Sequence, residues 1–213
     1  MSAPASTPAF LAPFTPLPTA ATRRRFLALD LGGGAPTSVR DFAMETQEQC
    51  LWCWAAVAVS VARKYAANTT WTQCSVATAF YQRQGEALQC CGADRAAGNR
   101  SQGLSAVFEV TRNLSGAAIA TAIAFQDLAA QIQSDRPVCV RIGWRFDQHQ
   151  SGHFIAVTGY TIGSGGQRYV HIQDPSVAAG QASHNQKDMT FEELTTGYDN
   201  GAGDWTWTYK TKP

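Results

Sequence analysis

The sequence predicts an α+β protein, with a helical part first and an antiparallel sheet after it. Residues 53–62 form a nearly unbroken apolar run, which is typical of a buried helix. After Pro137, short segments rich in Val, Ile, Tyr and Phe alternate with glycines, which is typical of strands joined by turns. Helices followed by strands indicate the α+β class. With 213 residues, 45% of them hydrophobic, the chain is long enough to bury one sizeable core.

The first helix is expected to begin at Cys53 and to end near Asn68. Arg63 and Lys64 suit its last turn, where basic side chains face the negative end of the helix dipole. A second helix is predicted over residues 75–83, with Ser75 as a candidate cap. A third, shorter helix is predicted over residues 126–133.

The strands are expected in the second half of the chain. Segments 138–144, 153–160 and 168–173 are rich in β-branched and aromatic residues, and Gly163, Gly165 and Gly166 separate the last two. Trp205, Trp207 and Tyr209 alternate with polar residues and indicate one more strand. No internal repeat interrupts this order.

Residues 1–40 differ from the rest and are interpreted as an arm, a linker or a propeptide, which leaves 41–213 as the folded domain. The segment holds six of the nine prolines and shows no periodicity. Within it, residues 22–27 resemble a twin-arginine export signal. The segment that follows carries Asp30 and three glycines, so it makes a poor apolar core for such a signal, and a solvated basic patch is the alternative.

Charge and hydropathy exclude two classes of partner. Seventeen basic and sixteen acidic residues leave a net charge of +1, which favours neither nucleic acid nor an anionic membrane. No apolar run approaches the roughly 20 residues of a membrane span, so we expect a soluble protein.

Cys53 is the candidate nucleophile. A hydrolytic thiol must be ionised, must lie beside a base that is itself oriented, and needs a donor for the oxyanion that develops. The N-terminus of a helix favours a thiolate, and Cys53 stands at the predicted start of the buried helix. The alternative is an inert buried cysteine, which is common in protein cores.

The segment from Gln47 to Ala55 resembles the nucleophile segment of papain-like cysteine proteases. In that family a Gln stands six residues before the nucleophile, a Cys stands three before it, and Trp-Ala follows it. All of these features are present. Leu51 and Trp52 replace the small pair that usually precedes the nucleophile, so the substrate cleft is expected to differ. The variant is closest to the bacterial subgroup of C39-type leader peptidases and AvrRpt2-like effectors.

The resemblance implies that His153 is the base and that Asp174 orients it. His153 begins a predicted strand just after Gly152, whereas His149, His171 and His184 lack that combination. Asp174 ends the strand predicted to pair with the His153 strand, and an Asp-Pro pair is typical of this bacterial subgroup. A carboxylate would fix the imidazole tautomer and stabilise its charged form. The alternative for Asp174 is an ordinary turn residue before proline.

The resemblance also assigns the oxyanion donors. Gln47 is the expected side-chain donor, together with the backbone N–H of Cys53, because an amide donates without titrating. Gln49 is the competing candidate, and the six-residue spacing favours Gln47.

The implied function is that of a cysteine peptidase, which cleaves a peptide or isopeptide bond through an acyl-enzyme. No metal or cofactor is implied, and a monomer acting on a protein or peptide is expected. An amidase, deamidase or peptidoglycan hydrolase on the same scaffold would use the same three residues. A non-catalytic binding module is the remaining alternative. The bacterial resemblance implies export from the cell or delivery as an effector.

The six cysteines leave several pairings open. The resemblance implies a disulfide between Cys50 and Cys91, or between Cys50 and Cys90, with Cys74 taking the remaining member of that adjacent pair. Cys139, flanked by valines in a strand, is expected to be a buried thiol. A reducing cytoplasm would keep every thiol free, and zinc binding at Cys50-x-x-Cys53 is disfavoured because no second pair has that spacing.

Overall fold

The computed structural model describes residues 34–176 and 186–213. Its helices are α1 (Cys53–Tyr65), α2 (Gln73–Arg83), α3 (Leu104–Thr111), α4 (Phe125–Gln133), α5 (Phe191–Thr196) and α6 (Tyr198–Gly201). Its strands are β1 (Thr37–Ser38), β2 (Val138–Trp144), β3 (Gly152–Ile162), β4 (Arg168–Gln173), β5 (Gln186–Thr190) and β6 (Gly203–Lys210). The twin-arginine-like segment at residues 22–27 lies outside the described residues.

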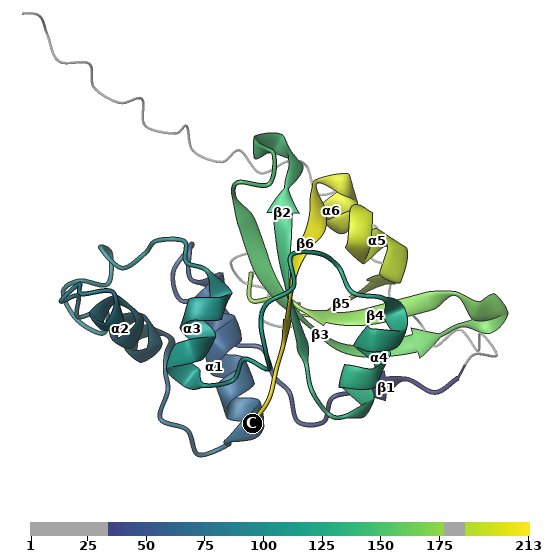
Figure 1. Ribbon diagram of the computed structural model, residues 1–213, viewed down its shortest axis with the longest axis horizontal. Helices are drawn as coiled ribbons and strands as arrows, with labels where there is room; N and C mark the ends of the chain where they lie inside the picture. Colours follow the sequence, from purple (N-terminus) through teal and green to yellow (C-terminus); the bar gives the residue numbers. More distant parts are fainter. Residues whose placement is uncertain (1–33, 177–185) are drawn as a thin grey trace, which may run out of the picture. The chain divides into compact units, whose positions relative to one another are not determined.

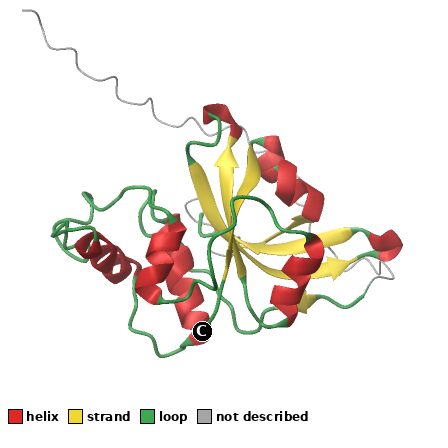
Figure 2. Cartoon of the chain, viewed as in Figure 1, coloured by secondary structure: helices red, strands yellow, loops and turns green. Residues whose placement is uncertain are grey.

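The sheet is antiparallel throughout, with strand order β5-β4-β3-β2-β6, and β1 pairs with β3. Figure 1 shows α1, α2 and α3 gathered on one side of this sheet, with α4, α5 and α6 against its other parts. The coloured elements of Figure 2 make the same division visible: a helical lobe followed by a β lobe. The predicted α+β fold of the papain-like type is therefore confirmed.

Residues 34–40, which the sequence placed in the arm, are tied to the sheet. Thr37 and Ser38 pair with Tyr160 and Gly159 of β3, and the N–H of Gly34 donates to the carbonyl of Ile162 at 3.1 Å. The described residues of this segment therefore contact the β-sheet of the folded domain.

Helix α1 is the centre of the helical lobe. All of its residues from Cys53 to Ala62 are buried, and α1 contacts α2, α3 and β3. The indole of Trp54 is fully buried against Phe80 and Tyr81 of α2. This packing explains why the apolar run has no polar face, since it is enclosed on nearly every side.

Helix α2 begins two residues earlier than predicted, and its cap differs. Thr72 is the N-cap: its hydroxyl accepts from the N–H of Ser75, while the hydroxyl of Ser75 accepts from the N–H of Thr72. Ser75 is thus the third residue of the helix and the partner of Thr72 in a reciprocal capping box, rather than the cap itself.

The predicted pairing of Cys50 with Cys91 is wrong. Cys91 bonds Cys74, with the two Cα atoms 4.8 Å apart. Cys74 lies in the first turn of α2, and Cys91 lies in the loop that returns after this helix. Cys50 is exposed on the loop before α1, where its sulfur accepts from the Asn99 amide at 3.1 Å. A loop of 17 residues is thus closed, and on the chain-entropy model such a crosslink stabilises by about 3 kcal/mol.

Two further thiols are buried. Cys90 is free despite its position next to Cys91, and its N–H donates to the hydroxyl of Thr78 at 2.9 Å. Cys139 is the predicted buried thiol of β2, and burial raises its pKa far above the ordinary value. Among the described residues, no helix is long and apolar enough to cross a membrane.

Candidate active site

Cys53 is the first residue of α1. The N-cap residue Trp52 makes no side-chain cap hydrogen bond, and its own N–H donates to the carbonyl of Gln49 at 3.0 Å. The N–H of Ala56 is the first to bond back into the helix, to the carbonyl of Trp52. The backbone N–H groups at the very start of α1, including that of Cys53, therefore lack an intrahelical acceptor. Helix N-termini of this kind favour negative charge on sulfur or oxygen.

His153 is the second residue of β3, and the glycine before it is needed for steric reasons. A Cβ atom at Gly152 would lie 2.3 Å from the carbonyl oxygen of Ile142 and 2.9 Å from the guanidinium carbon of Arg141. That guanidinium donates to the carbonyls of His149, Gln150 and Ser151, which form the loop leading into β3. Arg141 and Gly152 together fix the backbone that presents His153.

Asp174 follows the last residue of β4 and binds the imidazole. Nε2 of His153 and Oδ1 of Asp174 are 2.6 Å apart, which leaves Nδ1 of His153 as the ring nitrogen for Cys53. The side chain of Cys53 lies close enough to this imidazole to raise its pKa. The side chain of His153 is 12% exposed and that of Asp174 is 2% exposed, so this ion pair is shielded from water. The structure thus brings Cys53, His153 and Asp174 together.

Charge within this group stabilises the imidazolium. Burial by itself lowers the pKa of His153, but the hydrogen bonds and charges of Asp174 and Cys53 outweigh it and raise the pKa to about 9. Burial likewise works against ionised Asp174, but His153 and Lys187 hold the pKa of this carboxyl well below its usual range. A charged imidazolium between two acidic groups is the arrangement that a thiolate nucleophile requires.

The competing histidines lie elsewhere. His149 bonds Asp204 through Nε2 at 2.8 Å, and His171 bonds Asp188 through Nδ1 at 2.6 Å. Each forms a histidine–carboxylate pair, but neither interacts with a cysteine among the described contacts. His184 lies outside the described residues. Of the three histidine–carboxylate pairs in the described residues, the one that contains His153 stands beside a thiol at a helix start.

Gln47 lies in the segment that leads into the Cys53 loop, with its backbone tied to the end of β4. Its N–H donates to the carbonyl of Pro175 at 2.9 Å. Its side-chain amide donates to the carbonyls of Gln49 and Cys50, at 3.0 and 2.7 Å. Both hydrogens of the amide are therefore used within the loop. To serve as an oxyanion donor, Gln47 would have to exchange one of these bonds for the substrate.

Three site residues were not anticipated from the sequence. The ring of Trp144, at the end of β2, stacks on the His153 imidazole with centroids 6.4 Å apart and planes 13° from parallel. The hydroxyl of Tyr198 and the ammonium of Lys187 both donate to Oδ2 of Asp174 at 2.6 Å. Tyr198 and Lys187 lie on short, polar elements with no strong periodicity. The only sequence signal was that the strand predicted over residues 138–144 ends on the aromatic residue Trp144.

A pocket of 540 Å³ adjoins the His153 strand. It is lined by Gly152 and Phe154 on either side of His153 in the sequence, by Trp207 and Tyr209 of β6, and by residues 101–103 before α3. The lining combines aromatic faces with backbone amides and hydroxyls, which is the composition of a site for a peptide or a small organic ligand.

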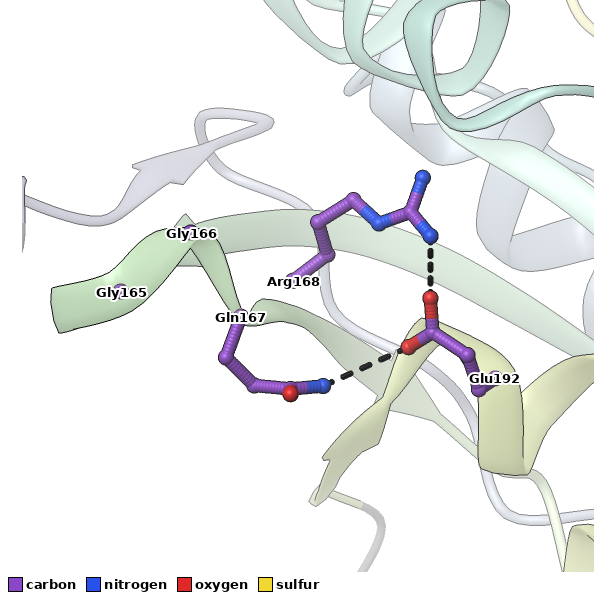
Figure 3. Close-up of a pocket in the computed structure, with 5 residues that line it drawn as sticks. All are labelled: Gly165, Gly166, Gln167, Arg168 and Glu192. Carbon is purple, nitrogen blue, oxygen red and sulfur yellow. Dashed lines mark hydrogen bonds and ion pairs between the residues drawn. The ribbon is translucent and has the colours of Figure 1, made fainter.

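A second pocket of 670 Å³, like the first, is lined by none of Cys53, His153 and Asp174. Figure 3 shows that Gly165, Gly166, Gln167, Arg168 and Glu192 line it. Both charged groups are engaged with each other, and the amide of Gln167 also donates to Glu192 at 3.4 Å. The residues that line this pocket include no Cys, Ser or His. Within residues 34–176 and 186–213, no three His, Cys, Asp or Glu side chains are grouped so that they could hold a metal ion.

A family model and solved structures match this chain. Among curated proteins, none matches the chain. One solved structure that matches is described as that of a C39-like peptidase from Bacillus anthracis. It is 12% identical, with a TM-score of 0.49, over 83% of this chain and 98% of that one. The model of the Peptidase_C39 like family matches residues 39–201, which include Cys53, His153 and Asp174. The chain belongs to the Peptidase_C39 like family.

Proposed function

We propose that this protein is a cysteine peptidase that hydrolyses a peptide or isopeptide bond through a thioester acyl-enzyme. The observation that carries the proposal is the 2.6 Å bond between Nε2 of His153 and Asp174, which turns Nδ1 toward a cysteine at an uncapped helix start. Family membership supports the same reaction class.

In the proposed acylation, the Sγ thiolate of Cys53 attacks the carbonyl carbon, and a C–S bond forms as the carbonyl oxygen becomes an oxyanion. The backbone N–H of Cys53 donates to this oxyanion, and Gln47 is the proposed second donor. The imidazolium of His153 gives its Nδ1 proton to the leaving nitrogen as the C–N bond breaks. A thioester and a free amine result.

Deacylation reverses the proton traffic. Neutral His153 takes a proton from water while the water oxygen attacks the thioester carbon. The C–S bond then breaks, which releases a carboxylic acid and restores the thiolate–imidazolium pair. Asp174 keeps its negative charge throughout and stabilises the imidazolium in both steps.

The cysteine pattern supports a working environment outside the cytoplasm. A disulfide between Cys74 and Cys91 forms and persists in oxidising compartments. Export from a bacterial cell, or delivery as an effector, is therefore part of the proposal.

A substrate screen tests the proposed function. Purified protein is incubated with a fluorogenic peptide library and, separately, with peptidoglycan, and the products are identified by mass spectrometry. We expect peptide cleavage, with a thioester to Cys53 trapped by acid quenching. Release of peptidoglycan fragments or of ammonia without chain cleavage would instead identify an amidase or a deamidase. The absence of any turnover, with no covalent adduct on Cys53, would indicate a binding module.

The pH dependence of kcat/KM is expected to be bell-shaped. The alkaline limb should lie near pH 9, because the raised pKa of His153 keeps the imidazolium protonated up to about that value. Above it the leaving nitrogen receives no proton from His153, so the rate falls. Initial rates measured between pH 4 and 11 on one peptide check this. A rate that still rises through pH 10 would contradict a protonated His153 as the acid.

A further inference from the structure

The carboxylate of Asp174 has every lone-pair direction occupied. Oδ1 accepts from His153 and from the backbone N–H of Ser176 at 2.8 Å. Oδ2 accepts from the ammonium of Lys187 and from the hydroxyl of Tyr198, both at 2.6 Å. The same ammonium also donates to the Tyr198 oxygen at 3.1 Å. The Asp174 carboxylate therefore binds the His153 imidazole through Oδ1 and the Lys187 ammonium through Oδ2.

The sheet places this cation. In the β4–β5 pair, Lys187 is directly opposite Ile172, and Asp174 lies two residues farther along β4's direction. Residues two apart on a strand share a face, and diagonal neighbours on adjacent strands lie within reach of a long side chain. Lys187 therefore extends across the end of the sheet toward Asp174. Its side chain is 40% exposed, so its stem reaches inward from the edge strand.

We propose that Lys187 is a positioning residue of this active site: its ammonium, with Tyr198, fixes the rotamer of Asp174 and moderates the charge that this carboxylate presents to His153. The inference rests on the proposed function, since it assigns a role within that reaction. It is distinct from the three residues that carry the chemistry, because Lys187 acts only through Asp174.

The surrounding charges define the direction of the effect. His153 faces Cys53 from α1, Asp174 from the end of β4, the uncharged Trp144 from β2 and, through Asp174, Lys187 of β5. Tyr198 of α6 contacts the carboxylate, and Asp199 follows it in the same helix. The order thiolate, imidazolium, carboxylate, ammonium alternates in sign. A cation beyond the carboxylate disfavours a second cation at His153, so its removal favours the imidazolium.

The test measures the protonation of His153 directly by NMR, which requires no turnover. The protein is labelled at histidine, the His153 resonance is assigned by comparison with His153→Gln, and its titration is followed in wild type, Lys187→Met and Lys187→Arg. We expect Lys187→Met to move the His153 midpoint upward by roughly half to one pH unit, and Lys187→Arg to restore it. The alkaline limb of kcat/KM should move by the same amount.

The controls separate this inference from the proposed function. Lys212→Met makes the same substitution at an exposed residue near the C-terminus and should leave the His153 midpoint unchanged. Tyr198→Phe removes a neutral donor and should shift it less than Lys187→Met does. If Lys187→Met folds and the His153 midpoint stays as in wild type or moves downward, the inference is overturned. If His153 shifts as expected but no variant hydrolyses any substrate, the proposed function fails and the positioning role stands. Lys187→Gln replaces Lys187→Met if the latter does not fold.

Discussion

Replacing Cys53 with alanine is expected to lower kcat/KM by roughly 10⁵- to 10⁶-fold, to the limit of detection. In the proposed reaction the acyl-enzyme forms on the thiol of Cys53, and alanine has no atom that can form it. The fold should persist, since a cysteine-to-alanine change removes one sulfur atom from a residue that is 8% exposed. Steady-state kinetics on the peptide found in the screen, together with thermal melting, measure both quantities.

A matched control distinguishes the nucleophile from cysteine loss in general. Cys50→Ala makes the same change three residues earlier, at an exposed thiol that is not bonded to another cysteine. Its kcat/KM should remain within a factor of about two, because surface substitutions away from special features have small effects. Retention of more than a tenth of wild-type activity by Cys53→Ala would remove the assignment.

Replacing Asp174 with alanine is expected to lower kcat/KM by about 10²- to 10⁴-fold, less than the loss of the nucleophile. Without the carboxylate, His153 loses the bond that turns Nδ1 toward Cys53, and the charge of Asp174 no longer opposes the effect of burial on the imidazole. Since burial lowers the pKa of His153, the alkaline limb should also move from about 9 to lower pH. The pH profile of kcat/KM reports both changes.

Asp188→Ala is the control for this prediction. Asp188 lies on β5 next to Lys187, and its carboxylate bonds Nδ1 of His171 at 2.6 Å. Asp188 and His171 therefore form a histidine–carboxylate pair outside the site. Its activity and pH profile should match wild type. An equal loss in the two variants would mean that Asp174 acts through stability alone, which thermal melting of both proteins would reveal.

The helices and strands that were predicted correctly have long, uninterrupted runs of apolar or β-branched residues. The start of α1 at Cys53 followed from an apolar run, and β2 and β4 followed from β-branched residues bounded by Pro137 and by glycines. Helix α1 is buried from Cys53 to Ala62 and most of β2 is buried, so tertiary packing and local propensity agree there. The juxtaposition of His153 and Asp174 also followed, because two paired strands had been assigned.

Elements stabilised by their neighbours were missed. Strand β5 is short and polar, and it is a strand because it pairs with β4 along its whole length. Helix α3 was missed because its Val and Phe residues are equally suited to a strand, and its burial against α1 and α2 decides the matter. Lys187 and Tyr198 lie on or next to such elements. The disulfide was mispredicted because spacing from the nucleophile does not reveal which loop returns beside α2.

The close approach of β2 to Gly152 has a consequence for how the protein tolerates change. A collection of inactivating substitutions would be expected to include position 152, although this residue makes and breaks no bond. Every amino acid other than glycine adds an atom where the Ile142 carbonyl already stands. A mutational scan scored by loss of activity would therefore mark Gly152, next to His153, as essential. The reason would be the lack of space for a side chain at this position, not a part in the chemistry.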